Sequence, residues 1–523
     1  MNDIFVVLGL LACVTALVPL ANRLAVPYPI LLVLGGLGLG FVPNNVLPDI
    51  VLRPDLVFLL FLPPLLYWAT LTMPWREFRA HLRPILLLAV GLVVATMCGV
   101  AAAAHAAVPA LTWPLAFVLG AIVSPPDAVA ATAIADRLGL PRRVATILEG
   151  ESLVNDATAL VAYATAVAVV AEGAFSPLAT GLHFAWEATG GVGIGLLVGW
   201  VVARLRRRLD DPMLESVISL LTPFAAYLPA YLLAASGVLA VVAAGFVVQY
   251  YAPLVVGSRS RLQADSVWEV VNFVLNGLVF ILIGLQLHPI FLALVGQSLA
   301  HLLWVAAAVS LAAIAVRIAW VAAAAAVGRV LGWRRTQDAL SAAEAAVIAW
   351  AGMRGVVSLA AAQALPTSFP QRNLILFLTF SVILATLVLQ GVSLPALIRR
   401  LGLSEGDVAA REEARARLAV TQAALTRLDA LATGDRMPPA LFDDLRRHYV
   451  ARAHLLVAQA NDGGAAERHA HARAYRDLRR DLLAVERQTL IELRGRNVIN
   501  DETLRRIQRA LDLDEVRLEA DAR

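Results

Sequence analysis

The sequence predicts an all-α protein that crosses a membrane about thirteen times and ends in a separate helical domain. Three observations support this fold class. Of the 523 residues, 59% are hydrophobic and 16% are charged, whereas an ordinary soluble domain is roughly 25% charged. The mean hydropathy is +0.73. Apolar stretches also recur along the chain at lengths near the roughly 20 residues that a helix needs to cross a bilayer.

The apolar stretches give the predicted spanning helices in order. They lie near residues 4–20, 28–43, 55–71, 84–107, 112–136, 143–171, 188–204, 214–235, 237–252, 268–288, 299–328, 342–365 and 373–398. In this order the first six and the last six stretches can form an inverted repeat with crossed discontinuous helices, an arrangement found in many transporters.

The connections between the stretches predict how the chain is oriented. The sequence has no lysine, so every fixed positive side chain is an arginine. Connections after odd-numbered stretches are rich in arginine, as in WREFRAHLR, ARLRRRLDD, SRSR and GWRR, and those after even-numbered stretches hold almost none. Because cytoplasmic loops collect arginine, we expect the N-terminus outside and the C-terminus in the cytoplasm, with the protein in the cell inner membrane.

A change of composition near residue 402 predicts a domain boundary. Residues 1–401 hold the apolar stretches, whereas 402–523 are charged and rich in alanine, with apolar residues three and four apart between arginines and acids. This spacing is typical of amphipathic helices. We expect a cytoplasmic helical domain with a regulatory or oligomerisation role.

The fifth stretch contains a break, in the sequence SPPDAVA. Pro125 and Pro126 lack amide donors and disfavour helix before them. Irregular backbone at membrane depth persists only where protein buries it or where it lines a wet cavity. Asp127 follows the break and can cap the next half-helix, and Ser124 before it can offer an oxygen or bond to the backbone.

The sixth stretch carries a group of polar residues in EGESLVNDA. Glu149 opens the group, Ser152 and Asp156 are four residues apart, and Glu151 and Asn155 are four apart on a neighbouring face. Oxygen ligands suit a hard monovalent cation. A carboxylate that exchanges this cation for a proton would form a transport site, although polar residues of this kind also hold membrane helices together.

The twelfth stretch carries a balancing positive charge. Arg354 lies between two glycines in GMRGVVSLA. A buried arginine needs an acid partner, and we expect Glu151 to pair with it, with Asn155 as a bridge. Elsewhere, Glu269 and Arg317 can form a structural ion pair or contribute to transport.

Other classes of function fit the sequence less well. An intramembrane enzyme would need a second catalytic aspartate or a serine and histidine pair, and no G-x-S-x-G or metal-ligand cluster is present. A passive cation channel would lack proton coupling. A non-transporting sensor would not need Asp156 and Arg354 intact. We therefore expect a transporter that is not an enzyme, has no cofactor and binds no nucleic acid.

Five motifs give the sequence a resemblance to the cation/proton antiporter 1 family, the sodium/proton exchangers. FLPPLLY, SPPDAVA, EGESLVNDA, NFVLNGLVFILIGLQ and GMRGVVSLA stand in the order of that family over some 400 residues. The resemblance implies thirteen spans, a homodimer, and a core domain that moves against a dimerisation domain by alternating access. It implies exchange of a monovalent cation, Na⁺ or alternatively K⁺, for H⁺.

The resemblance also implies roles for individual residues. Asn155 and Asp156 match the asparagine and aspartate pair of the family, so Asp156 is expected to take a proton or a cation in turn. Ser152 matches a second Na⁺ ligand. The same pair implies electroneutral one-for-one exchange. Glu151 and Arg354 match the buried ion pair of the family.

Two segments depart from the family pattern. Asp127 matches the acidic residue of the unwound fifth span, but Pro126 stands where the family has a threonine, and Ala128 where a proline is common. The third span lacks the acid that follows the PPLLY motif in many members. The threonine side-chain oxygen is absent, and main-chain carbonyls of residues 124–126 are left to face the ion.

Overall fold

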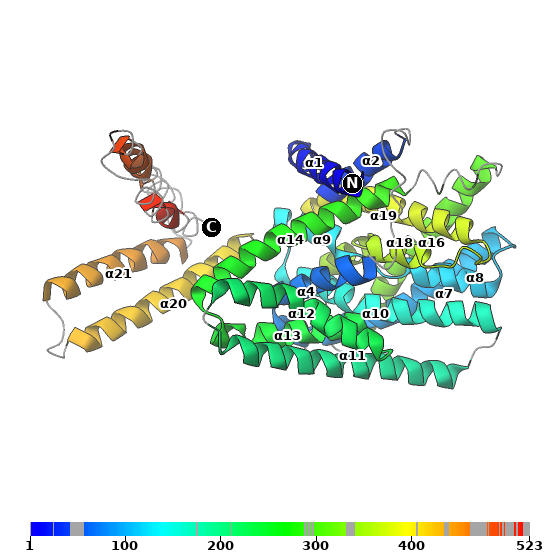
Figure 1. Ribbon diagram of the computed structural model, residues 1–523, viewed down its shortest axis with the longest axis horizontal. Coiled ribbons are helices and arrows are strands. Elements are labelled where there is room, and N and C mark those ends of the chain that lie inside the picture. Colours follow the sequence, from blue (N-terminus) through cyan, green and yellow to red (C-terminus); the bar gives the residue numbers. More distant parts are fainter. Residues whose placement is uncertain are drawn as a thin grey trace. The chain divides into compact units, whose positions relative to one another are not determined.

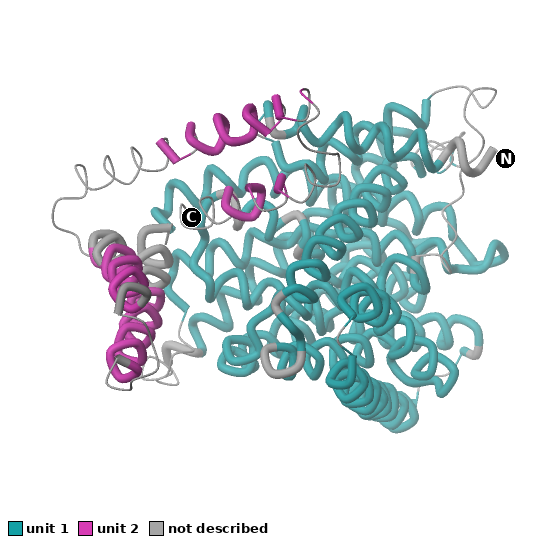
Figure 2. Tube along the Cα trace, turned by 60° about the vertical axis from the view of Figure 1, so that its left-hand side comes forward, with its two compact units in different colours: residues 1–404 teal, residues 405–523 magenta. Residues whose placement is uncertain are grey.

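The computed structural model describes most of the chain as helix (Figure 1). The described residues are 2–24, 26–41, 57–173, 176–209, 211–286, 290, 294, 298–330, 340–403, 406–432, 439–460, 478–479, 481–490, 492–493, 496, 507–508 and 511–515. Within these ranges there is no strand. Two compact units, Met1–Ser404 and Glu405–Arg523, are coloured separately in Figure 2.

The first half of the larger unit contains the two N-terminal helices, a third and a fourth segment that each include a π-helical turn, a broken fifth segment and a long sixth helix. The elements are α1 (Asn2–Arg23), α2 (Tyr28–Gly40), the π-helical turn η1 (Val57–Phe61), α4 (Leu62–Thr72), α5 (Trp75–Ala80), α6 (Leu82–Leu86), the π-helical turn η2 (Leu87–Leu92), α7 (Val93–Ala107), α8 (Trp113–Val123), α9 (Ala128–Leu138) and α10 (Arg142–Glu172).

Within the described residues, the second half contains five long helices, a second broken pair and a final long helix. The elements are α11 (Pro177–Arg206), α12 (Pro212–Leu232), α13 (Gly237–Val255), α14 (Ser258–Leu285), α16 (Leu299–Val330), α17 (Ala342–Trp350), α18 (Val356–Gln363) and α19 (Arg372–Leu401). Each predicted apolar stretch overlaps one of these helices or a pair of helix halves.

Length and composition confirm the membrane class. Seven of the helices in the described ranges are long and apolar enough to cross a membrane, and five shorter ones are also apolar. Large apolar side chains face outward from them: Leu178, Leu182 and Leu197 of α11 are 74%, 64% and 61% exposed. Such a surface suits lipid rather than water. The larger unit is a multi-pass membrane protein.

Helix α11 begins earlier than the sequence predicted, at Pro177 instead of near residue 188. Its first turns contain polar residues that interrupt the apolar run. The Ser176 hydroxyl accepts a hydrogen bond from the Ala179 amide and caps the helix. His183 Nδ1 lies 3.2 Å from Glu187 Oε1, one turn further on. These local contacts stabilise the helical conformation of a segment that hydropathy alone did not assign to the helix.

Glycines let α11 approach α13 at backbone distance. Gly191, Gly195 and Gly199 recur every four residues, and a Cβ on any of them would overlap α13 main chain, at Ser236, Ala240 and Ala244 respectively. Small residues at this spacing allow close helix packing inside a membrane.

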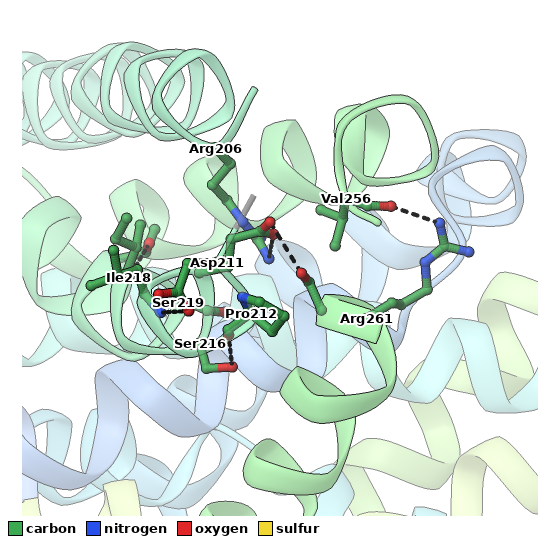
Figure 3. A network of polar contacts seen from close by, with 12 residues as sticks. Arg206, Asp211, Pro212, Ser216, Ile218, Ser219, Val256 and Arg261 are labelled. Carbon is green, nitrogen blue, oxygen red and sulfur yellow. Dashed lines mark hydrogen bonds and ion pairs between the residues drawn. The ribbon is translucent and has the colours of Figure 1, made fainter. Parts of the chain in front are cut away.

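A polar network joins one end of α11 to α12 and α14 (Figure 3). Arg206 Nη2 lies 3.5 Å from Glu215 Oε2, and the Ser260 hydroxyl donates to Glu215 Oε1 at 3.1 Å. Asp211 caps α12 by accepting from the Met213 amide at 2.8 Å. Arg206 and Glu215 are 5% and 2% exposed, so this buried pair fixes the three helices relative to one another.

The smaller unit contains α20 (Gly406–Ala432) and α21 (Pro439–Ala460), which pack together. Arg446 Nε of α21 lies 3.3 Å from Asp429 Oδ1 of α20. Further along, hydrogen bonds to Glu515 and Asp512 raise the pKa of Arg487. The regulatory or oligomerisation role of the smaller unit stays a prediction.

Candidate ion-binding site

The fifth span breaks where the sequence predicted. Helix α8 ends at Val123 and α9 begins at Ala128. Asp127 Oδ1 accepts a hydrogen bond from the Val129 amide at 2.9 Å, so the carboxylate caps the second half-helix. Ser124 is buried, and its hydroxyl donates to the Ala121 carbonyl at 2.8 Å. The hydroxyl proton of Ser124 is therefore used within its own segment.

A second break faces the first. Helix α17 ends at Trp350 and α18 begins at Val356. The Asp127 amide donates to the Met353 carbonyl at 2.7 Å. A carbonyl of the second break therefore accepts from a backbone amide that the first break leaves without a helical partner. Gly355 has no room for a side chain, because a Cβ there would overlap the Asp127 carboxylate. The two unwound segments are in direct contact.

Helix α10 places three polar residues against the first break. The Asn155 amide donates to the Pro126 carbonyl at 3.0 Å, and the Ser152 hydroxyl lies 3.5 Å from the same oxygen. Asn155 is fully buried and Asp156 is 6% exposed. The prediction that Asn155 bridges Glu151 and Arg354 is therefore wrong, since its amide donates to the unwound segment.

One cavity reaches these groups. It has a volume of about 640 Å³ and is lined by Asp156, Ser152, Asp127, Pro126 and Glu149, among others. Three carboxylates, a hydroxyl and main-chain oxygens at one cavity are the donor set that a hard monovalent cation prefers. The arrangement can hold such a cation, or a proton on a carboxylate, at the junction of three segments.

The buried ion pair uses a different arginine from the one predicted. Arg317 of α16 holds Glu151 in a bidentate pair, with Nη1–Oε1 and Nη2–Oε2 distances of 2.6 and 2.8 Å. Both side chains are 1% exposed, and Arg317 Nε also donates to the Ile348 carbonyl at 3.1 Å. The predicted pairing of Glu151 with Arg354 is wrong.

A glycine explains why Arg317, and not Arg354, pairs with Glu151. A Cβ on Gly352 would overlap the Arg317 side chain, so the glycine leaves the space through which Arg317 reaches Glu151. Arg354 is 1% exposed, and its amide donates to Thr386 Oγ1 at 3.1 Å. Within the described part of the chain its Nε and Nη1 have no hydrogen-bond partner, although its charge interacts with those of Arg317 and Glu151.

Glu269 does not belong to this site. It lies exposed on α14, and Arg317 is already paired with Glu151. The alternative that Glu269 pairs with Arg317 is therefore wrong.

Sequence reasoning did not assign several residues that share the cavity. Tyr28 of α2, Ser358 of α18, and Asn272 and Asn276 of α14 line it together with Asp156. The two asparagines gave a signal in the sequence because their spacing puts them on one helix face. Nothing in the sequence marks Tyr28 or Ser358.

Two touching helix breaks beside buried carboxylates, in a multi-pass membrane protein, define the broken-helix class of secondary transporters. The family model of the sodium/hydrogen exchanger transmembrane domain matches residues 9–400. The chain belongs to the sodium/hydrogen exchanger family, which confirms the resemblance found in the sequence.

Two comparisons with individual relatives agree. An uncharacterized Na⁺/H⁺ exchanger of Mycobacterium tuberculosis is 40% identical over 527 residues, 98% of this chain and 96% of that protein. A Na⁺/H⁺ antiporter of Aphanothece halophytica is 33% identical and covers 78% of this chain and 76% of its own length. The family and these relatives support cation/proton antiport as the activity of this chain.

Comparison with solved structures supports the fold. The sodium/proton antiporter of Methanocaldococcus jannaschii, solved at pH 8, matches with a TM-score of 0.60 and 19% identity, over 77% of this chain and 99% of that one. The predicted antiporter fold is confirmed.

Proposed function

We propose that the protein exchanges Na⁺ for H⁺ by competition at Asp156. The observation that carries the proposal is the position of Asp156, buried on α10 yet lining the cavity with Ser152 and the unwound segment of the fifth span. When Asp156 is ionised, Na⁺ binds between its carboxylate, Ser152 and main-chain oxygens of that segment. When Asp156 is protonated, the cation site is lost.

The charges around the site favour one-for-one exchange. Besides Asp156, the carboxylates of Asp127 and Glu149 line the cavity, and Glu151 pairs with Arg317 nearby. In the proposed cycle only Asp156 is loaded, and its one negative charge is cancelled by either one proton or one monovalent cation. Moving an uncompensated charge through a low-dielectric barrier is costly. Only the loaded forms therefore cross by alternating access, and exchange is electroneutral.

Potassium is the second candidate cation. A relative from Bacillus pumilus that is named a sodium, potassium, lithium and rubidium/H⁺ antiporter is 34% identical over 76% of this chain and 61% of that protein. A cavity of about 640 Å³ also has room for a larger ion. Sodium is placed first because the relatives from Mycobacterium tuberculosis and Aphanothece halophytica are named Na⁺/H⁺ exchanger and Na⁺/H⁺ antiporter.

The positions of the arginines indicate how the chain is oriented in the membrane. Arginine in the last turns of α1, α11 and α19 supports a cytoplasmic side at those ends. The N-terminus then lies outside and the C-terminus in the cytoplasm, with the protein in the cell inner membrane. The homodimer that the family resemblance implies is part of the same proposal.

Proteoliposomes with a trapped pH-sensitive dye test the function. We expect an imposed Na⁺ gradient to change the internal pH in the wild type, independent of membrane potential. Asp156→Asn is expected to reduce this exchange more than 100-fold, because the exchanging carboxylate is gone, while the variant keeps the fold of the wild type. Repeating the measurement with K⁺ ranks the two cations.

Two outcomes contradict the proposal. Proton-coupled flux that persists in Asp156→Asn would show that another group exchanges the proton. A cation leak that generates no pH change in the wild type would identify a passive channel.

A further inference from the structure

A pair of asparagines on α14 lies at the cavity that reaches Asp156. The Asn276 amide donates to Asn272 Oδ1 at 2.9 Å, and both residues line the cavity. Asn276 is 3% exposed. This bond uses an amide hydrogen of Asn276 and the side-chain carbonyl oxygen of Asn272. The side-chain carbonyl oxygen of Asn276 takes no part in it.

The bond does not explain why amides stand at membrane depth. Polar residues that hold membrane helices together bond from one helix to another. Asn272 and Asn276 are four residues apart on α14, and their bond stays within that helix. A leucine pair would stabilise α14 as well without placing amides at membrane depth, so the pair serves the cavity.

The wall that carries this pair is held in place. Gly284 of α14 and Gly36 of α2 pack so closely that a Cβ on either would overlap main chain of the other helix. A Cβ on Gly277, the residue after Asn276, would overlap the Val14 side chain of α1. The amides therefore have a fixed position relative to α1 and α2, as a site that selects an ion requires.

We propose that Asn276, held by Asn272, supplies a neutral oxygen to the cation on its way to Asp156 and so helps to determine cation affinity. The inference rests on the proposed antiport and deepens it. An amide oxygen is a suitable ligand for a monovalent cation and exchanges no proton at cellular pH. Asn276 therefore acts on cation binding, whereas Asp156 carries the competition with the proton.

Two substitutions at residue 276 separate this role from a structural one. Asn276→Leu removes both the oxygen and the internal bond, whereas Asn276→Asp keeps an oxygen but, when ionised, has no donor for Asn272. Ser266→Ala is the matched control on the same helix, because Ser266 is exposed and its hydroxyl bonds to Leu262 of its own helix. Each purified variant is compared in the dye-loaded proteoliposomes over a series of Na⁺ concentrations.

We expect Asn276→Leu to raise the KM for Na⁺ about tenfold, the effect of one lost polar contact, with kcat nearly unchanged. Asn276→Asp and Ser266→Ala are expected to show no such rise. Equal increases in Asn276→Leu and Asn276→Asp would overturn the proposal in favour of the internal bond, and a KM within about twofold of wild type in Asn276→Leu would also overturn it.

The proposed antiport and this inference fail in different ways. If the wild type produces no cation-driven pH change, the antiport is wrong and the role of Asn276 with it. If the wild type exchanges and only the KM prediction fails, the antiport stands. Should Asn276→Leu not be recovered folded, Asn276→Ala, which also removes the oxygen, is judged by the same KM criterion.

Discussion

Two acids of α10, five residues apart, differ in what surrounds them. Glu151 is bound by both terminal nitrogens of Arg317, at 2.6 and 2.8 Å, and is 1% exposed. Asp156 is 6% exposed and lines a cavity of about 640 Å³. A carboxylate held in a bidentate pair keeps its charge, whereas one that faces a cavity can exchange its counter-ion. In the proposed mechanism, one helix thus carries a paired charge and an exchangeable one.

The difference arises from the segments that face α10. Gly352 in the second break admits Arg317 to Glu151, whereas the first break presents the Pro126 carbonyl to Asn155 and Ser152. The Asn155 bond fixes the helix against the unwound segment without using Asp156. The comparison predicts that changes near Glu151 reduce stability, and that changes near Asp156 reduce transport.

The largest effect on stability is expected for Arg317→Ala. This variant leaves Glu151 buried without its partner, which costs roughly 3 to 5 kcal/mol. Thermal unfolding of the detergent-purified protein measures the loss. Arg354→Ala is the matched control, because Arg354 is equally buried but makes no direct bond to Glu151 among the described contacts, and its loss of stability should be smaller.

A double variant tests whether the pair itself is responsible. Combining Glu151→Gln with Arg317→Met removes both charges and should recover most of the stability lost in Arg317→Ala. If Arg354→Ala is the more damaging single variant, then Arg354, not Arg317, is the partner of Glu151 and the comparison fails.

A smaller effect is expected for Gly355→Ala, at the contact between the two breaks. The added Cβ overlaps the Asp127 carboxylate, so the segments must shift, at a cost of about 1 to 3 kcal/mol. Exchange should fall with stability because Asp127 lines the cavity. Gly193→Ala is the control: nothing lies within 4 Å of its Cβ, and it should be neutral or up to ~1 kcal/mol more stable. Equal melting temperatures for the two variants would contradict a tight contact between the breaks.

The features that the sequence predicted correctly depend on local patterns. The break at Ser124–Asp127 follows from two adjacent prolines, and the cap by Asp127 follows from its position at the start of a half-helix. Hydropathy and length were sufficient for the membrane class. The start of α11 was missed because its first turns depend on a cap and an i,i+4 contact that hydropathy does not register.

Pairings between distant helices were not predictable. The sequence predicted Arg354 as the partner of Glu151, but Arg317 also lies inside an apolar stretch, and spacing along the chain does not say which arginine reaches Glu151. The deciding feature is the space left by Gly352, which depends on how α16 packs against the second break. Tyr28 and Ser358 were missed for the same reason, because only the fold brings α2 and α18 to one cavity.

The smallest effect is expected for Ser152→Ala, on the exchangeable side of α10. The hydroxyl lies 3.5 Å from the Pro126 carbonyl, which also accepts from the Asn155 amide at 3.0 Å. The contact between α10 and the break therefore remains, and removing the hydroxyl should change stability by about 1 kcal/mol or less. As a proposed cation ligand it should raise the KM for Na⁺ about five- to tenfold. Ser381→Ala, whose hydroxyl bonds to Phe377 of its own helix, should leave the KM unchanged. A loss of stability without a change in KM would make Ser152 a packing residue and leave Asp156 as the side-chain ligand of α10, so this variant tests how much of the exchangeable face the cation uses.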